Sequence, residues 1–247
     1  MKLTHAVLLA CACTAPLAAA SPITITSSNS GVFAGAGSSS DSAADTATGL
    51  PYSATIGATA GTSTSTLALD WNDSATSVVF DFTLTQAIDS RQGGLSIDTA
   101  QAFSSQLVFT PVVDVNYALS GNYALGSSDT ARVFYSVQLL ETGAGSVFAQ
   151  TDESNSTVGE SFTLGVGGGD ATSSVTGASS GVLLAGQEYA LFFSAFVQSR
   201  DASGNGAALA ASAAGEVVLS MHTVPEPATL ALLGVAGLLG SRRARRA

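Results

Sequence analysis

Apolar and polar residues alternate along several short stretches of this chain, and that period of two constrains the fold more than any other feature. Between Ser77 and Leu84, for example, Val78, Phe80 and Phe82 fall on one face of an extended segment, which is the spacing of a half-buried β-strand. Gly, Ser, Asn and Asp residues separate such stretches, as turns do in antiparallel domains. The alternation predicts strands at Thr64–Trp71, Ser77–Leu84, Gln106–Tyr117 (with a break at Pro111), Arg132–Leu139, Phe162–Val166, Glu188–Gln198 and Glu216–His222.

The predicted fold class is therefore all-β, a single antiparallel β-sandwich of jelly-roll-like type. Its body is expected at residues 51–222, where no ten-residue stretch has a capped helical period and no repeat of 20–50 residues is seen. Residues 21–50 are expected to form a low-complexity lead segment outside the sandwich, because the run Gly35–Ser40 offers a core no large side chain. A signal peptide (1–20) and a segment with a short transmembrane helix (223–247) flank these parts.

The charge of the chain is strongly acidic and unevenly placed. Eight basic residues face 18 acidic ones, for a formal net charge of −10. Within residues 21–222 the basic residues are Arg91, Arg132 and Arg200. Nucleic-acid binding depends on neutralising phosphates with Lys and Arg, so no nucleic-acid partner is expected, and the excess of acids is interpreted as a means of solubility.

The N-terminus has the three parts of a secretory signal peptide. Lys2 supplies the positive n-region, Ala6–Leu17 the apolar stretch, and Ala18 and Ala20 the small residues before a cut. Signal peptidase is therefore expected to cleave before Ser21 and to release the body outside the cytoplasm.

Cys11 leaves an alternative open, since Leu8-Leu9-Ala10-Cys11 also resembles a lipoprotein signal in which the cysteine would be lipidated. Against this, fewer apolar residues precede Cys11 than a signal peptide needs. Cleavage before Ser21 removes both Cys11 and Cys13, so the mature protein is expected to contain neither a disulfide nor a reactive thiol.

The C-terminus ends in an uncharged segment followed by a cluster of arginines. The segment 228–240 would form a helix about 20 Å long, shorter than the roughly 30 Å bilayer core, so flanking residues must be recruited or the membrane thinned. Basic residues beside an apolar segment stay in the cytoplasm, which predicts that the body lies outside. The membrane-facing residues are Ala228, Leu230, Leu232, Leu233, Val235, Leu238 and Leu239, and the basic tail (241–247) holds Arg242, Arg243, Arg245 and Arg246.

Val224, Pro225, Glu226 and Pro227 stand directly before this helix. The two prolines fix their φ angles and favour extended geometry, so residues 224–227 should form an exposed peptide that a protease can bind. Motif, apolar helix and basic cluster in this order resemble the PEP-CTERM sorting signal of Gram-negative bacteria. The resemblance covers the last 24 residues, implies recognition by exosortase, a membrane-embedded transpeptidase, and implies nothing about the fold of the body.

Catalytic residues, metal ligands and cofactor-binding motifs are not predicted, and the protein is interpreted as a non-enzyme. His222 is the only histidine after signal removal, whereas zinc sites and Ser–His catalysis need more partners. A glycosidase needs only two carboxylates at the right distance, so an acid pair drawn from Asp70, Asp73, Asp81 and Asp98 remains a remote alternative.

The predicted function is that of an exported surface or extracellular-matrix protein of structural or adhesive type. The inner membrane would hold it transiently before exosortase passes it to the outer surface, and the resemblance implies exopolysaccharide as an associated partner. A carbohydrate-binding β-sandwich module is the alternative, and it predicts an exposed aromatic strip on one sheet face. Trp71, the only tryptophan, is expected in the core because it alternates with Leu67 and Leu69. Self-assembly through weakly protected strand edges is a further variant.

Overall fold

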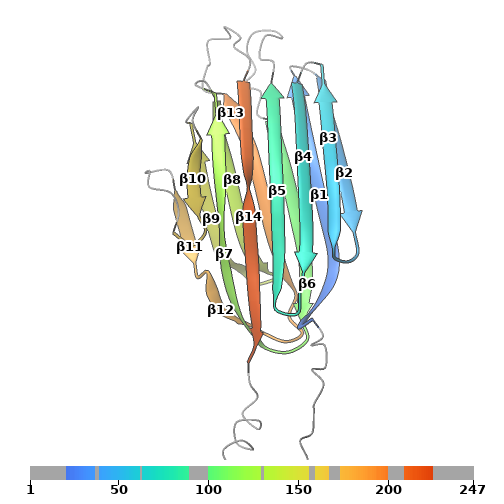
Figure 1. The fold of residues 1–247 in the computed structure, drawn as a ribbon, viewed down its shortest axis with the longest axis vertical. Coiled ribbons are helices and arrows are strands. Elements are labelled where there is room, and N and C mark those ends of the chain that lie inside the picture. The colour runs from blue at the N-terminus through green and yellow to red at the C-terminus, as the bar shows by residue number, and fades with distance from the viewer. Residues whose placement is uncertain are drawn as a thin grey trace, which may run out of the picture.

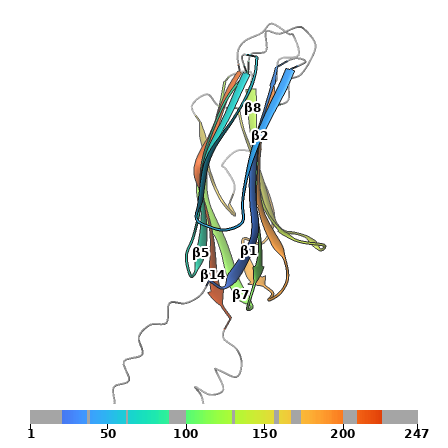
Figure 2. The same cartoon turned by 90° about the vertical axis from the view of Figure 1, so that its right-hand side faces the viewer.

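The computed structural model describes residues 21–36, 39–61, 63–88, 100–128, 131–155, 159–166, 173–199 and 209–224. These residues form two seven-stranded sheets that pack face to face (Figures 1 and 2). All described strand pairs are antiparallel. The predicted all-β antiparallel sandwich is therefore confirmed.

Sheet A has the strand order β11-β9-β8-β13-β6-β1-β2. Its strands are β1 (Ile23–Ala36), β2 (Ser39–Ala47), β6 (Ala100–Pro111), β8 (Ala131–Glu141), β9 (Gly145–Ser154), β11 (Ser174–Gly177) and β13 (Tyr189–Ser199). Sheet B has the order β10-β7-β14-β5-β4-β3, with β12 pairing onto β7. Its strands are β3 (Tyr52–Ala60), β4 (Ser63–Asp73), β5 (Ser77–Ile88), β7 (Val115–Ser127), β10 (Glu160–Thr163), β12 (Ser180–Leu183) and β14 (Leu209–Thr223).

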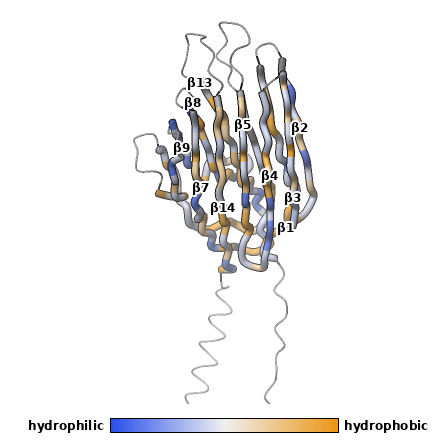
Figure 3. The backbone as a smooth tube through the Cα atoms, turned by 45° about the horizontal axis from the view of Figure 1, so that its top comes forward, coloured by the Kyte–Doolittle hydropathy of each residue, from blue (hydrophilic) through white to orange (hydrophobic). Residues whose placement is uncertain are grey.

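The core lies between the sheets and is built by the predicted alternation. In β4 and β8 every second side chain is buried, and Figure 3 shows hydrophobic positions recurring along the strands. Aromatic rings connect the two inner faces: Phe80 lies 4.4 Å from Phe193 and Phe82 lies 5.2 Å from Tyr135, measured between ring centroids. Such contacts add to the burial of apolar area that stabilises a domain of this size.

The lead segment belongs to the sandwich, contrary to expectation. Strand β1 pairs with β6 and β2 pairs with β1, and Val32 and Ala34 of β1 are buried in the core. The sandwich therefore begins at Ile23 and not at residue 51. Small residues suffice here because backbone pairing, rather than large side chains, holds β2 at the edge of the sheet.

The first strand, β1, begins and the last strand, β14, ends at the same end of the sandwich, which we call the base. The base comprises residues 112–114 between β6 and β7, residues 184–188 between β12 and β13, and the two ends of the described chain. The Val112 amide donates to the Pro22 carbonyl at 2.9 Å, and the Val224 amide donates to the Asp114 carbonyl at 2.9 Å. Figure 2 shows β1 beginning and β14 ending at this end. One loop thus ties down both ends of the described sandwich.

Candidate functional site

A row of polar side chains crosses the outer face of sheet B. The strand register places Asp70 of β4 directly opposite Asp81 of β5, and Asp81 opposite Glu216 of β14. Ser53 continues the row on one side, where its hydroxyl donates to Asp70 Oδ1. Asn122 continues it on the other side. Like charges directly opposite one another destabilise a sheet, so this row should lower the stability of sheet B.

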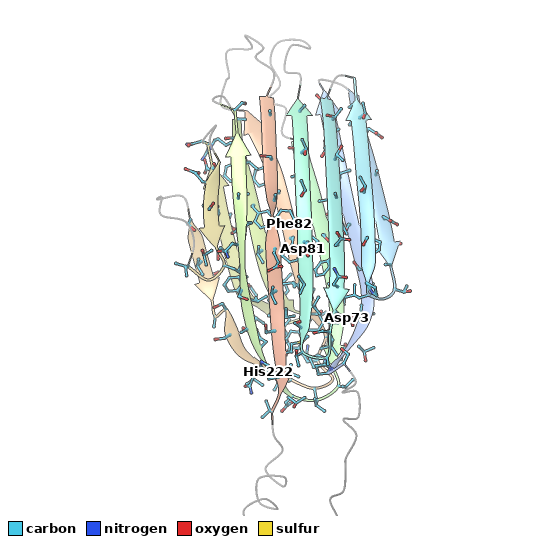
Figure 4. All side chains as sticks on the ribbon, viewed as in Figure 1. Asp73, Asp81, Phe82 and His222 are labelled. Atoms are coloured by element: carbon cyan, nitrogen blue, oxygen red, sulfur yellow. The ribbon has the colours of Figure 1, made fainter. Side chains whose placement is uncertain are left out.

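Asp70 and Asp81 also line an open hollow of about 310 Å³ on this face. Figure 4 shows Asp81 in the middle of the sheet, whereas Asp73 and His222 lie near its lower end. The structure therefore brings together two of the acids considered for an acid pair and leaves Asp73 apart; Asp98 lies outside the described residues. Among the residues that the structure describes, no group of three His, Cys, Asp or Glu side chains has the arrangement of a metal site.

Trp71 lies in the core, as the sequence predicted. It is fully buried, its ring lies 4.4 Å from Phe80 and 5.6 Å from Phe193, and its indole N–H donates to Ser105 Oγ at 3.2 Å. A side chain held on all sides in this way is unavailable to a ligand. The single tryptophan is therefore not a surface residue for sugar stacking.

Three phenylalanines instead form a strip on the outer face of sheet A. Phe134 and Phe196 are half-buried and stack across β8 and β13 at 4.5 Å, and the Arg132 guanidinium lies 4.9 Å from the Phe134 ring centre. Arg132 also forms an ion pair with Glu153, so its charge is locally neutralised. Phe134 therefore contacts both an aromatic ring and a guanidinium on this face.

Phe192 is the third member of the strip. It is half-buried and lies opposite Gln106 of β6 and Gln138 of β8 in the register. Phe192 and Phe196 occupy the positions of β13 that alternate with its buried residues. The sequence carries a signal for this strip, because large apolar side chains occur at both the inward-facing and the outward-facing positions of β13. The sequence analysis did not predict that the outward-facing phenylalanines lie on the surface.

A buried polar cluster between β7 and β9 escaped sequence analysis. Asp152 is fully buried, and its carboxylate accepts hydrogen bonds from the Tyr123 hydroxyl, the Ser173 hydroxyl and, at 2.7 Å, the Gln150 amide. Burial, and then the Asp152 carboxylate, raise the pKa of Tyr123, and burial raises the pKa of Tyr135 well above its usual range. Every acceptor oxygen of Asp152 is satisfied, so the cluster has the character of a structural network.

The predicted processing sites fall at the edges of the described structure. Ser21 and Val224 are its first and last residues. Val224 follows β14 directly, and its amide is bonded to the base, so the predicted sorting motif begins directly after the last strand. The remaining predicted residues lie outside the described residues: Ala18, Ala20, Cys11, Pro225, Glu226, Pro227, the segment 228–240 and the arginines of the basic tail.

A membrane-spanning helix is not found in the part of the chain that the structure describes.

Comparison with known protein families finds a match at the C-terminus of the chain. The family described as "PEP-CTERM protein-sorting motif" matches residues 223–246. No protein with a curated description matches the sequence. Among solved structures, a chain from "Structure of infectious bursal disease virus Gx strain" aligns with 83% of this chain at 10% identity and a TM-score of 0.31, and this chain spans 53% of that protein's length. The chain therefore carries a PEP-CTERM sorting motif at its C-terminus, which marks an exported protein targeted to exosortase.

Proposed function

We propose that this protein is a non-enzymatic surface or matrix protein of structural or adhesive type, which exosortase trims and passes to the outer surface in association with exopolysaccharide. The sorting motif at residues 223–246 carries the proposal. The sandwich is consistent with it, because Val224, the first residue of the predicted motif, directly follows β14 at the base. The short helix at 228–240 would anchor the chain only until the tail is removed.

Mass spectrometry of the extracellular protein tests this function. In cells with exosortase we expect an N-terminus at Ser21 and a C-terminus within residues 224–228, because the two prolines keep this peptide extended for the protease. In cells lacking exosortase we expect the chain to keep Arg242–Ala247 and to remain in the membrane fraction. An intact tail in both strains would contradict exosortase processing and make 228–240 a permanent anchor.

A carbohydrate-binding module is the second candidate, and the phenylalanine strip on sheet A favours it. Sugar rings stack their C–H faces on aromatic rings while amides and hydroxyls bind their polar edges. Phe192 between Gln106 and Gln138 offers both kinds of group. The Arg132–Glu153 ion pair leaves the strip without net charge, which suits a neutral rather than an acidic polysaccharide.

Replacing Phe192 with alanine tests this second candidate. We expect the variant to lose retention on the producing cells' own polysaccharide by about 5-fold or more, since stacking on an aromatic side chain is worth roughly 1–3 kcal/mol where it has been measured for nucleobases. Val175→Ala, on the exposed strand β11, is the matched control and should retain normal binding. Equal retention of both variants would contradict carbohydrate binding by the strip.

The carboxylate row on sheet B is proposed to be solvated and non-catalytic. Asp70 is exposed and Asp81 is half-buried on an open face, where nothing among the described residues excludes water. In the same retention experiment we expect no new reducing ends to be released from the polysaccharide. Release that is abolished by Asp81→Asn would instead favour the acid-pair hydrolase.

A further inference from the structure

Exposed apolar side chains concentrate at the base of the sandwich. Among the described residues, the exposed large hydrophobic side chains are Val112, Val113, Val166, Val175, Val182, Leu184 and Val224. All except Val166 and Val175 lie at the base or on β12 beside it. The exposed fractions of Val112 and Leu184 are 57% and 54%, and a cluster of exposed apolar side chains is typical of an interaction surface.

Hydrogen bonds fix these side chains next to one another. The Gly186 amide donates to the Pro111 carbonyl at 2.8 Å, and the Ala185 amide donates to Asp114 Oδ1 at 2.8 Å. The same loop receives the Val224 amide. The loops that carry Val112, Val113 and Leu184 are therefore held against the end of β14. We call Val112, Val113, Val182, Leu184 and Val224 the base patch.

The short distance in sequence between the base patch and the predicted membrane helix indicates that the patch contacts the membrane. Three residues separate Val224 from Ala228, where the predicted membrane helix starts. Four residue steps span at most about 14 Å, and the headgroup layer of a bilayer is about 5–8 Å thick. Once residues 228–240 enter the membrane, the base cannot stand far from the lipid surface.

The length of the predicted helix favours the same contact. Thirteen residues give about 20 Å of helix against a hydrocarbon core of about 30 Å, and a helix this short draws its flanking residues toward the membrane. Val224 and the rest of the base patch are apolar flanking groups that can enter the interface. We propose that the base patch lies on the outer surface of the bilayer while the chain is anchored and awaits exosortase.

The charge of the base indicates which surface chemistry it accepts. Asp114 lies within the base, and Glu188 lies at its edge, where its backbone carbonyl accepts the Thr142 amide. Carboxylates are repelled by anionic lipid, so the contact is apolar and is made with zwitterionic lipid. Its strength should consequently not change with salt, unlike an electrostatic attachment.

Lipid-depth quenching tests this inference, which rests on the proposed anchoring. The chain, with its tail retained, is isolated from membranes of cells lacking exosortase and reconstituted in phosphatidylcholine vesicles. Since the mature chain is expected to be free of cysteine, Val113→Cys and Leu184→Cys each introduce a single site for a fluorophore. Val166→Cys and Val175→Cys are matched controls, because these exposed valines lie just after β10 and on β11, and Figure 1 shows these two strands at the side of the sandwich.

We expect nitroxides near the lipid headgroup to quench the two base labels several-fold more strongly than the two control labels, at both low and high salt. Equally weak quenching at all four positions, with the protein floating with the vesicles, would overturn the base contact and leave the anchoring intact. Failure to float would overturn both. Strong quenching that appears only when exosortase is added would assign the patch to the protease and overturn the lipid contact.

Discussion

Replacing Trp71 with alanine should lower the free energy of unfolding by about 3–5 kcal/mol, the usual cost of removing a large buried aromatic side chain. The ring contacts Phe80 and Phe193 from opposite sheets, so its loss opens a cavity between the layers. Domains of this kind are stabilised by only about 5–15 kcal/mol, so the variant should lose a large fraction of its folding stability. Urea unfolding followed by far-UV circular dichroism measures the effect, since the substitution removes the only tryptophan.

Phe192→Ala is the matched control for this experiment. It also truncates an aromatic side chain, but Phe192 is half-buried on the outer face of sheet A, so a loss of about 1 kcal/mol is expected. Trp71→Phe should fall between the two, because it keeps most of the packing and loses the hydrogen bond to Ser105. If Trp71→Ala were no more destabilising than Phe192→Ala, the core assignment of Trp71 would be wrong.

Strands with strong contrast between their two faces could be predicted from the sequence. In β5, Val78, Phe80, Phe82 and Leu84 alternate with smaller or polar residues, and the predicted strand starts at the observed residue, Ser77. Burial of one face dictates the phase of such a strand. The sandwich followed from several segments of this kind.

Strands without that contrast were missed or shortened. Strand β14 begins at Leu209 and not near Glu216, because its first half consists mainly of alanine and serine, which do not distinguish the two faces. In β9 the residues Asp152, Glu153 and Ser154 are buried in succession, so the period of two is lost where the polar cluster forms. In β2 the strand arises from pairing with β1, which local sequence does not encode.

The arrangement of the candidate sites was only partly accessible from the sequence. Asp70 and Asp81 were among the acids considered for an acid pair, and the register of the consecutive strands β4 and β5 places them opposite each other. Glu216 joins them because β14 lies beside β5, a pairing between distant segments that no local pattern reveals. The base patch depends likewise on two loops and a chain end brought together by the sheet topology.

Replacing Asp152 with alanine should cost about 3–5 kcal/mol of folding stability, as removal of one partner from a buried charged network does. The Tyr123 and Ser173 hydroxyls and the Gln150 amide would lose their common acceptor in the interior. The Gln150 amide keeps the Thr163 carbonyl as an acceptor, so the loss falls mainly on the buried Tyr123 hydroxyl, and a buried donor left unpaired costs roughly 1–3 kcal/mol. Asp152→Asn preserves the shape and one oxygen, so its effect should be smaller, and urea midpoints of the two variants compare them directly.

A double-mutant cycle with Tyr123→Phe separates the network from mere packing. Tyr123→Phe keeps the ring, which lies 4.5 Å from Tyr135 and 5.7 Å from Phe162, and removes only the hydroxyl. If that hydroxyl and Asp152 are coupled, the double variant should be more stable than the two single losses predict, by about 0.5–3 kcal/mol. Additive losses would mean that the hydrogen bond contributes nothing. The contribution of Asp152 to stability would then come from its hydrogen bonds with Ser173 and Gln150.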